Sequence, residues 1–172
     1  MKALILGGAR SGKSKYAQQL AEQTGQAVVY IATAAPGDDE MRLRIEQHQQ
    51  DRPASWQLIE EPLDLVSVLE SYHQDKVCLL VDCLTLWLSN QLIKDASKVA
   101  AAIDALVETV NRLELTLIMV SNEVGMGIVP MGEISRQFVD ESGRMHQKLA
   151  QVCDQVVMVI AGLPQQLKNQ DN

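Results

Sequence analysis

The sequence predicts one α/β domain with a mainly parallel sheet and helices on both of its faces. Short apolar runs rich in Val, Ile and Leu recur along the chain, and the segments between them have the spacing of helices. This alternation implies parallel strands whose connecting helices cover the sheet. The strands are expected at Ala3–Leu6, Ala27–Ala32, Val77–Val81, Leu115–Val120 and Gln155–Ile160, with a weaker one at Gln57–Glu60.

Helical segments fill the gaps between the expected strands. No repeat or linker divides the chain, so residues 1–163 are interpreted as one nucleotide-binding catalytic domain. Residues 164–172 are polar and are expected to form a frayed C-terminal tail. The helices are expected near residues 13–24, 39–50, 63–73, 84–94, 97–113 and 141–153.

The composition fits one compact domain that does not bind nucleic acid. With 172 residues, of which 47% are hydrophobic, the chain is long enough to bury a single core. The apolar residues are aliphatic rather than aromatic, which suits a parallel sheet and argues against a surface on which bases stack. A net charge of −7 also disfavours binding to a phosphate backbone. An anionic ligand must therefore be held by local donors.

The cysteines and the start of the chain indicate a soluble, cytoplasmic protein. Cys78, Cys83 and Cys153 are odd in number and form no C-x-x-C pair, so neither a disulfide framework nor a zinc site is indicated. The first apolar run is too short for a secretory signal, and no segment approaches a membrane span. We therefore expect reduced thiols and no membrane insertion.

A phosphate-binding loop follows the first expected strand. Residues 7–14 match G-x-x-x-x-G-K-[ST] and lie between an apolar run and a helical segment, which is the context that this motif requires. Glycines let backbone N–H groups converge on a polyphosphate, the lysine adds a positive charge, and the final hydroxyl can bind Mg²⁺. The loop predicts a nucleoside triphosphate ligand and a RecA-like P-loop NTPase domain. Its residues are Gly7, Gly8, Ala9, Arg10, Ser11, Gly12, Lys13 and Ser14.

Polar residues at the carboxyl ends of the expected strands are further site candidates, because parallel sheets bind ligands at that edge. Asp82 ends an apolar run and is placed to hold Mg²⁺ opposite Ser14, although an aspartate there can also serve only as a helix cap. Residues 33–34 follow the second strand. Residues 121–123 follow the fourth, and the loop that starts at Glu123 is interpreted either as a substrate lid or as a plain turn.

His48 is a candidate catalytic residue. Met41, Ile45 and His48 share one face of the second expected helix, so the imidazole points toward protein rather than bulk water. Such a histidine can be a packed core residue or a catalytic group. Arg44 and Arg52 favour catalysis, because two guanidinium groups near an imidazole fit a visiting anion.

The motifs extend along nearly the whole chain, and generic phosphate-loop enzymes do not share the set. In order and spacing the set resembles the bifunctional adenosylcobinamide kinase/adenosylcobinamide-phosphate guanylyltransferase family of cobalamin biosynthesis. The residues that carry the resemblance are Gly7–Ser14, Ala32-Thr33, Asp39-Glu40-Met41, Arg44, Ile45, His48, Arg52-Pro53, Trp56, Glu60, Asp82–Thr85, Ser121–Pro130, Arg136–Phe138, Asp140, Gly143-Arg144 and Gln147.

The resemblance implies a two-step enzyme that uses ATP or GTP with Mg²⁺. The first step phosphorylates the aminopropanol hydroxyl of adenosylcobinamide, and the second transfers GMP from GTP to adenosylcobinamide phosphate. His48 matches the family's guanylylated histidine, and Lys13 is the other catalytic residue. Family members form homo-oligomers, and a trimer is expected. GTP contacts are implied for the phosphate loop and for Ala32, Thr33, Ala34, Gln49, Gln50, Asp51, Arg52, Glu60 and Asp82, with Ser14 and Asp82 at the metal.

Two other functions fit a phosphate loop. A small-molecule kinase would carry out γ-phosphoryl transfer alone and would not need His48. A non-catalytic nucleotide switch would turn over GTP slowly and would need no acceptor. One position departs from the family, because His146 precedes Gln147 where the family commonly has Asn.

Overall fold

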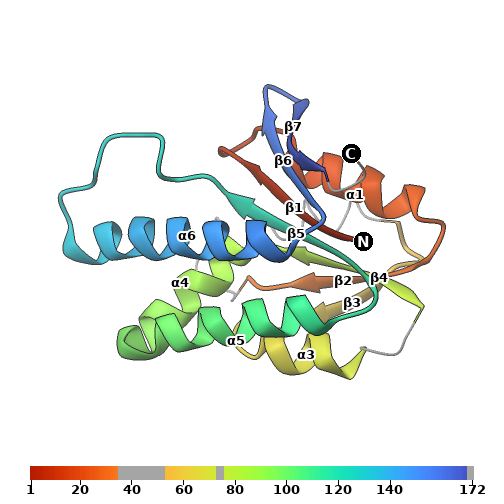
Figure 1. The fold of residues 1–172 in the computed structure, drawn as a ribbon, viewed down its shortest axis with the longest axis horizontal. Helices are drawn as coiled ribbons and strands as arrows, with labels where there is room; N and C mark the ends of the chain where they lie inside the picture. The colour runs from red at the N-terminus through yellow and green to blue at the C-terminus, as the bar shows by residue number, and fades with distance from the viewer. Residues whose placement is uncertain (35–52, 73–75, 170–172) are drawn as a thin grey trace.

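The chain forms a seven-stranded sheet with helices on both faces, in a computed structural model that describes residues 1–34, 53–72 and 76–169 (Figure 1). The expected helix at 39–50 lies outside the described residues. The strands are β1 (Lys2–Gly7), β2 (Ala27–Ala32), β3 (Gln57–Glu60), β4 (Val77–Asp82), β5 (Thr116–Asn122), β6 (Gln155–Ile160) and β7 (Leu163–Asn169). The helices are α1 (Lys13–Gln23), α3 (Leu65–Ser71), α4 (Leu84–Asp95), α5 (Val99–Arg112) and α6 (Glu133–Val152), with a short 3-10 helix at Ala96–Lys98.

The strand order places β5 between the two strands that carry the nucleotide motifs. The order is β3-β2-β4-β5-β1-β6-β7, and neighbouring strands are parallel except for β6 and β7. Gly7 at the end of β1 pairs with Asn122 of β5, and Asp82 at the end of β4 pairs with Val120. The phosphate loop, Asp82 and the loop after β5 therefore leave the sheet at the same edge.

Side chains that alternate across the sheet divide the core into two layers. One layer packs against α3, α4, α5 and α6, and the other packs against α1 on the opposite side of the sheet (Figure 1). Helix α1 presents the small residues Ala17 and Ala21 to the sheet, and both are 0% exposed. Trp87 of α4 is buried in the larger layer, where its Nε1 donates a hydrogen bond to the Leu63 carbonyl at 3.0 Å. The predicted mainly parallel sheet with two covered faces is confirmed.

The cysteines lie in the core of the domain. Cys78, Cys83 and Cys153 are free thiols and all three are buried, as the absence of a disulfide pattern predicts. Within the described ranges, no helix has both the length and the apolar character that a membrane crossing needs.

The prediction of a frayed tail after residue 163 is wrong for the described residues. Leu163–Asn169 form β7, which pairs antiparallel with β6 across a turn at Ala161 and Gly162. Both turn residues have positive φ, 51° and 80°, as in the tight turns that match strand twist. Lys168 also ties the strand to α6 by donating to the Ala150 carbonyl at 2.9 Å. All of β7 except Lys168 is exposed, so the strand has no apolar alternation from which it could be predicted.

Helix α6 is longer than the sequence predicts, because it begins at Glu133 rather than near residue 141. Its buried residues lie between Ser142 and Leu149, and none lies in the first nine residues. The first turns are exposed, with Ile134 at 74%, so they carry no apolar periodicity that would indicate a helix. In Figure 1 this first half extends away from the sheet, after a long loop that follows β5.

Removing β7 should destabilise the protein. A chain that ends at Leu163 loses the antiparallel partner of β6 and the contacts of Lys168. Its free energy of unfolding should fall by about 2 kcal/mol or more, since each of several hydrogen bonds contributes roughly 1 kcal/mol. Urea denaturation followed by circular dichroism measures the change. A chain that ends at Asn169 is the control, and equal stability of the two truncations would contradict a structural role for β7.

Candidate functional site

The phosphate loop connects β1 to α1 and has backbone angles that suit its motif. Gly12 stands at the N-terminus of α1 with φ of 94°, in the left-handed region that favours glycine. Arg10 is also left-handed, with φ of 56°. The N–H of Ser11 donates to the Gly8 carbonyl at 3.2 Å and closes the turn. Left-handed residues in a tight turn before a helix form a concave surface of N–H groups that binds anions.

Two positions of the loop require glycine, because neighbouring backbone lies where a side chain would begin. A Cβ on Gly7 would lie 2.4 Å from Ser11 Oγ and 2.6 Å from the Val159 carbonyl oxygen, both too short for any side chain. A Cβ on Gly12 would lie 3.2 Å from the Cα of Gly162 in the β6–β7 turn. The N–H of Gly162 donates to the Ser11 carbonyl at 2.8 Å, so this turn supports the loop from outside.

Lys13 is a buried cation at the base of the loop. Its side chain is 9% exposed, and Nζ donates to the Gly8 carbonyl at 3.1 Å. Burial lowers the pKa of Lys13, while the nearby charge of Asp82 opposes that change. A desolvated ammonium group gains most from an anionic partner, since burial weakens its interaction with water. The lysine therefore fits a polyphosphate held on the loop.

Asp82 and Ser14 carry side-chain oxygen atoms at the same edge of the sheet. Asp82 is the last residue of β4, and Ser14 is in the first turn of α1. A carboxylate and a hydroxyl are the hard ligands that Mg²⁺ prefers, and this ion commonly takes one or two protein ligands together with phosphate oxygens. The residue types therefore fit the metal that the sequence predicts, and Mg²⁺ binding by Ser14 and Asp82 stays a prediction.

Thr33 has a structural use for its side chain that the sequence did not predict. The residue is 0% exposed, and its Oγ1 donates to the Cys83 carbonyl at 2.5 Å and accepts from the Cys83 N–H at 3.0 Å. Its own carbonyl accepts a hydrogen bond from Asn90 Nδ2 at 2.9 Å. These contacts join the end of β2 to the segment after Asp82, so the hydroxyl fixes the edge of the sheet on which Asp82 lies.

The remaining candidate nucleotide contacts differ in their distance from the loop. Ala32 pairs with Asp82 on one side and with Glu60 on the other. Glu60 is exposed at the end of β3, and three strands separate β3 from β1. Ala34 is half-buried. Outside the described residues lie His48, Gln49, Gln50, Asp51 and Arg52.

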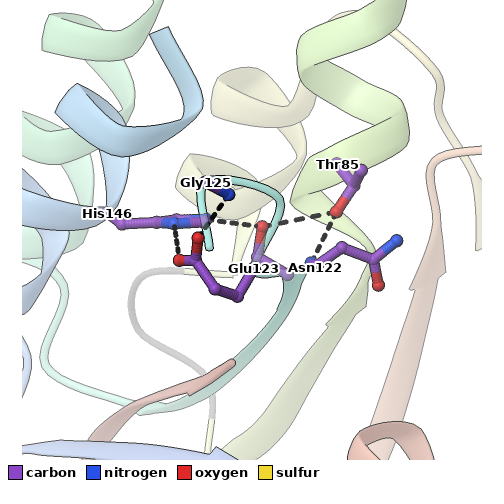
Figure 2. A network of polar contacts seen from close by, with 6 residues as sticks. Thr85, Asn122, Glu123, Gly125 and His146 are labelled. Atoms are coloured by element: carbon purple, nitrogen blue, oxygen red, sulfur yellow. Dashed lines mark hydrogen bonds and ion pairs between the residues drawn. The ribbon is translucent and has the colours of Figure 1, made fainter. Parts of the chain in front are cut away.

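A buried polar network lies beside the phosphate loop, at the end of β5 (Figure 2). His146 of α6 places Nε2 2.8 Å from Ser121 Oγ, and its Nδ1 lies 3.7 Å from Glu123 Oε2. Glu123 Oε1 accepts the Gly125 N–H at 2.5 Å. On the other side of Ser121, Thr85 Oγ1 lies 3.4 Å from the serine hydroxyl. The network therefore links α4, β5, α6 and the start of the loop after β5.

The spacing of the buried residues of α6 is a sequence signal for this network. The buried residues of α6 lie at spacings of three and four residues. They are Ser142, Met145, His146 and Leu149. That spacing places His146 on the apolar face of a helix, where a polar side chain needs a partner. Ser121, on β5, is the polar residue that it meets. Which partner a buried histidine has depends on the packing of α6, which the spacing alone does not give.

Burial should make the contribution of His146 to stability depend on pH. Desolvation lowers the pKa of His146 below its usual range, and the charge of Glu123 opposes that change. As the pH falls below about 6.5, the unfolded chain takes up a proton that the folded protein resists, so the free energy of unfolding decreases. This contribution is complete above the unfolded pKa and is lost toward the lower folded pKa.

The measurement compares the wild-type protein with His146→Leu in urea denaturation at about pH 8 and about pH 5.5, on either side of the reference value. The stability difference between them should be larger at the higher pH. A difference that is larger at the lower pH would mean that the folded protein holds His146 protonated.

Comparisons with known proteins agree with this arrangement of residues. The family model for "Cobinamide kinase / cobinamide phosphate guanyltransferase" matches residues 3–167. The chain is 51% identical over 171 residues to the bifunctional adenosylcobalamin biosynthesis protein CobP of Pseudomonas aeruginosa, with 99% of each chain covered. It is 36% identical over 182 residues to the bifunctional adenosylcobalamin biosynthesis protein CobU of Escherichia coli, with 98% of this chain and 100% of that protein covered.

Solved structures with similar folds have little sequence in common with the chain. A structure from Pyrococcus horikoshii OT3 has a TM-score of 0.60 at 11% identity and covers 98% of this chain and 86% of that one. An ATPase from the type III secretion system of pathogenic bacteria has a TM-score of 0.58 at 11% identity, covering 91% of this chain and 51% of that one. These likenesses concern the fold alone, which is that of the P-loop NTPases. The near-complete matches in sequence show that the chain belongs to the cobinamide kinase/cobinamide phosphate guanyltransferase family.

Proposed function

We propose that this protein phosphorylates adenosylcobinamide and then transfers GMP from GTP to the new phosphate, giving adenosylcobinamide-GDP. The observation that carries the proposal is the family match over residues 3–167, which includes a phosphate loop whose glycines and lysine have the geometry of an anion site. The relatives from both bacteria are named as bifunctional proteins of adenosylcobalamin biosynthesis. The named activity of the family fits the nucleotide motifs of this chain.

In the first step the phosphate loop holds the triphosphate of ATP or GTP. Backbone N–H groups of the loop and the buried ammonium of Lys13 offset the charge that develops as the γ-phosphoryl group leaves. Ser14 and Asp82 would hold Mg²⁺, which when bound supplies positive charge to the phosphate oxygens. Such a transfer needs little covalent chemistry from the protein, so positioning of the reactants and stabilisation of charge account for most of the rate acceleration.

In the second step His48 is the nucleophile. A neutral imidazole is a competent nucleophile near neutral pH, since its reference pKa is about 6.5. Its attack on the α-phosphorus of GTP forms a nitrogen–phosphorus bond and expels pyrophosphate. The phosphate of adenosylcobinamide phosphate then displaces the imidazole and takes the GMP. A simple kinase has no use for this histidine, so the His48 step separates the two-step enzyme from its nearest alternative.

The size of the acceptor supports a site shared between protomers. A corrinoid is wide relative to a domain of 172 residues, so a crevice within one chain offers little of the surface needed to enclose it. We therefore retain the homotrimer as part of the proposal. Light scattering coupled to size-exclusion chromatography determines the mass of the assembly, and a monomeric protein at working concentration would contradict it.

Replacing Lys13 by Ala should impair both half-reactions. The loop then lacks the cation that compensates charge on the polyphosphate, and kcat should fall at least about 100-fold, as it does on loss of one stabilising donor. Kinase and guanylyl-transfer rates are measured separately with labelled nucleotide. Lys15→Ala removes an exposed lysine from the same helix and serves as the control. Near-normal kinase turnover in Lys13→Ala would refute the phosphate-loop assignment.

The protein should acquire one GMP on His48 when it meets GTP and Mg²⁺ without acceptor. Mass spectrometry of the intact protein and of its peptides identifies the adduct and its position. The bond should break in acid and persist in alkali, because protonation of the phosphoramidate nitrogen makes imidazole a good leaving group. His48→Ala should lose the adduct and guanylyl transfer but retain kinase activity, whereas His73→Ala should keep all three. A GMP label on His73 or His146 would show that the mechanism is wrong.

A further inference from the structure

Glu123 stands at the junction between the phosphate loop and Asp82. It is the first residue after β5, and its backbone N–H donates to the carbonyl of Gly7, the first residue of the phosphate loop, at 3.0 Å. Because β5 lies between β1 and β4, the chain at Glu123 leaves the sheet between the two nucleotide motifs. The side chain of Glu123 retains 20% of its accessible surface, so it is neither fully buried nor free in solvent.

The carboxylate of Glu123 is held by contacts on both of its oxygens (Figure 2). Oε1 accepts the Gly125 N–H at 2.5 Å, and Oε2 lies 3.7 Å from His146 Nδ1. His146 is itself fixed by Ser121 at 2.8 Å. Burial lowers the pKa of His146, so the neutral imidazole is the form that the fold favours. The ring therefore contacts the carboxylate without placing a permanent positive charge beside it.

The two proposed steps differ in their need for such a group. In the kinase step the acceptor is an alcohol, which must lose a proton as it becomes a phosphate ester. In guanylyl transfer the acceptor is a phosphate monoester, whose second pKa is near 6, so its attacking oxygen already carries negative charge at neutral pH. A general base is therefore useful in the first step only.

We propose that Glu123 is the general base of the kinase step, and that His146 and the Gly125 N–H position its carboxylate for this role. The inference rests on the proposed function, since it assigns a residue to the first of its two steps. The acceptor oxygen forms a bond to the γ-phosphorus while the bond from that phosphorus to the bridging oxygen breaks. The hydroxyl proton passes to the Glu123 carboxylate, and the nucleoside diphosphate leaves with the electron pair of the broken bond.

Other carboxylates at this edge are less suited, among the residues that the structure describes. Glu60 lies on β3, and three strands lie between β3 and β1. Glu61 directly follows β3, so the same strands lie between it and the phosphate loop. Asp82 is the residue that we assign to Mg²⁺, and a metal-bound carboxylate is a poor proton acceptor. Glu123 combines proximity to the loop with an orientation fixed from two sides.

Glu123→Gln tests the proposal, because it keeps the shape and the Gly125 contact but cannot accept the proton. The kinase step is assayed with ATP and adenosylcobinamide, and guanylyl transfer with GTP and adenosylcobinamide phosphate prepared beforehand. The kinase kcat should fall about 100-fold or more, while guanylyl transfer should stay within about threefold of the wild-type rate. Glu108→Gln changes an exposed glutamate on α5 and should leave both rates unchanged.

Two results would overturn the role of Glu123. Equal losses in both half-reactions would mean that the side chain only supports the fold of the loop, and a normal kinase rate would mean that no proton is transferred to it. If the wild-type protein phosphorylates no cobinamide, the proposed function itself fails, which is a distinct outcome because it is seen before any variant is made.

The positioning role of His146 is tested by two replacements. His146→Asn places an amide near the position of Nδ1, from which it can donate to Glu123, whereas His146→Leu retains bulk but makes no polar contact. The kinase kcat should fall about tenfold or more in the Leu variant and recover in the Asn variant, with the KM for ATP unchanged in both. Equal losses in the two variants, or a change in KM for ATP alone, would contradict the positioning role.

Discussion

Parallel pairing of β4, β5 and β1 is the constraint on which the site depends. Backbone hydrogen bonds fix the register of these three strands. Gly7 pairs with Asn122 and Asp82 pairs with Val120, so the three strands end at the same edge of the sheet. The arrangement follows from strand length and register, and the loops that begin at this edge carry the functional groups. A slip in the register of β5 would separate the phosphate loop from the residues that serve it.

The fold also uses burial to tune charged and polar groups near that edge. Lys13 and His146 are both largely removed from water, and burial lowers the pKa of each. For the lysine this creates a cation that binds an anion more strongly than an exposed one would. For the histidine it favours a neutral ring that can orient a carboxylate without holding it as a salt bridge. Burial thus strengthens the attraction of Lys13 for an anion and favours the neutral form of His146.

Sequence patterns predict the buried part of this molecule well and its exposed part poorly. The central strands are continuous apolar runs, and the phosphate loop is defined by residues whose backbone roles are specific, such as Gly7 and Gly12. By contrast, β7 and the first turns of α6 are exposed. Their sequences therefore show no apolar periodicity from which a strand or a helix could be predicted.

The candidate site divides in the same way. Local motifs predict the phosphate loop and Asp82, because their chemistry depends on neighbours in the chain. The contact of His146 with Ser121 joins residues 25 positions apart, and that of Thr33 with Cys83 spans 50. Such pairs depend on how α6 and β2 pack, which spacing within one segment does not determine. Tertiary packing also gives the hydroxyl of Thr33 a structural partner that its place after a strand does not reveal.

The central place of β1 has a consequence for how the protein is made. This strand precedes its neighbours in the chain by more than 100 residues, because both strands that flank it, β5 and β6, begin after residue 115. The turn that supports the phosphate loop comes later still, at Gly162. Contacts between distant parts of a chain form slowly, because a long loop must close before they are gained. On the ribosome the nucleotide loop therefore emerges well before β5, β6 and the turn at Gly162, so a nascent fragment has the motif without the contacts that support it.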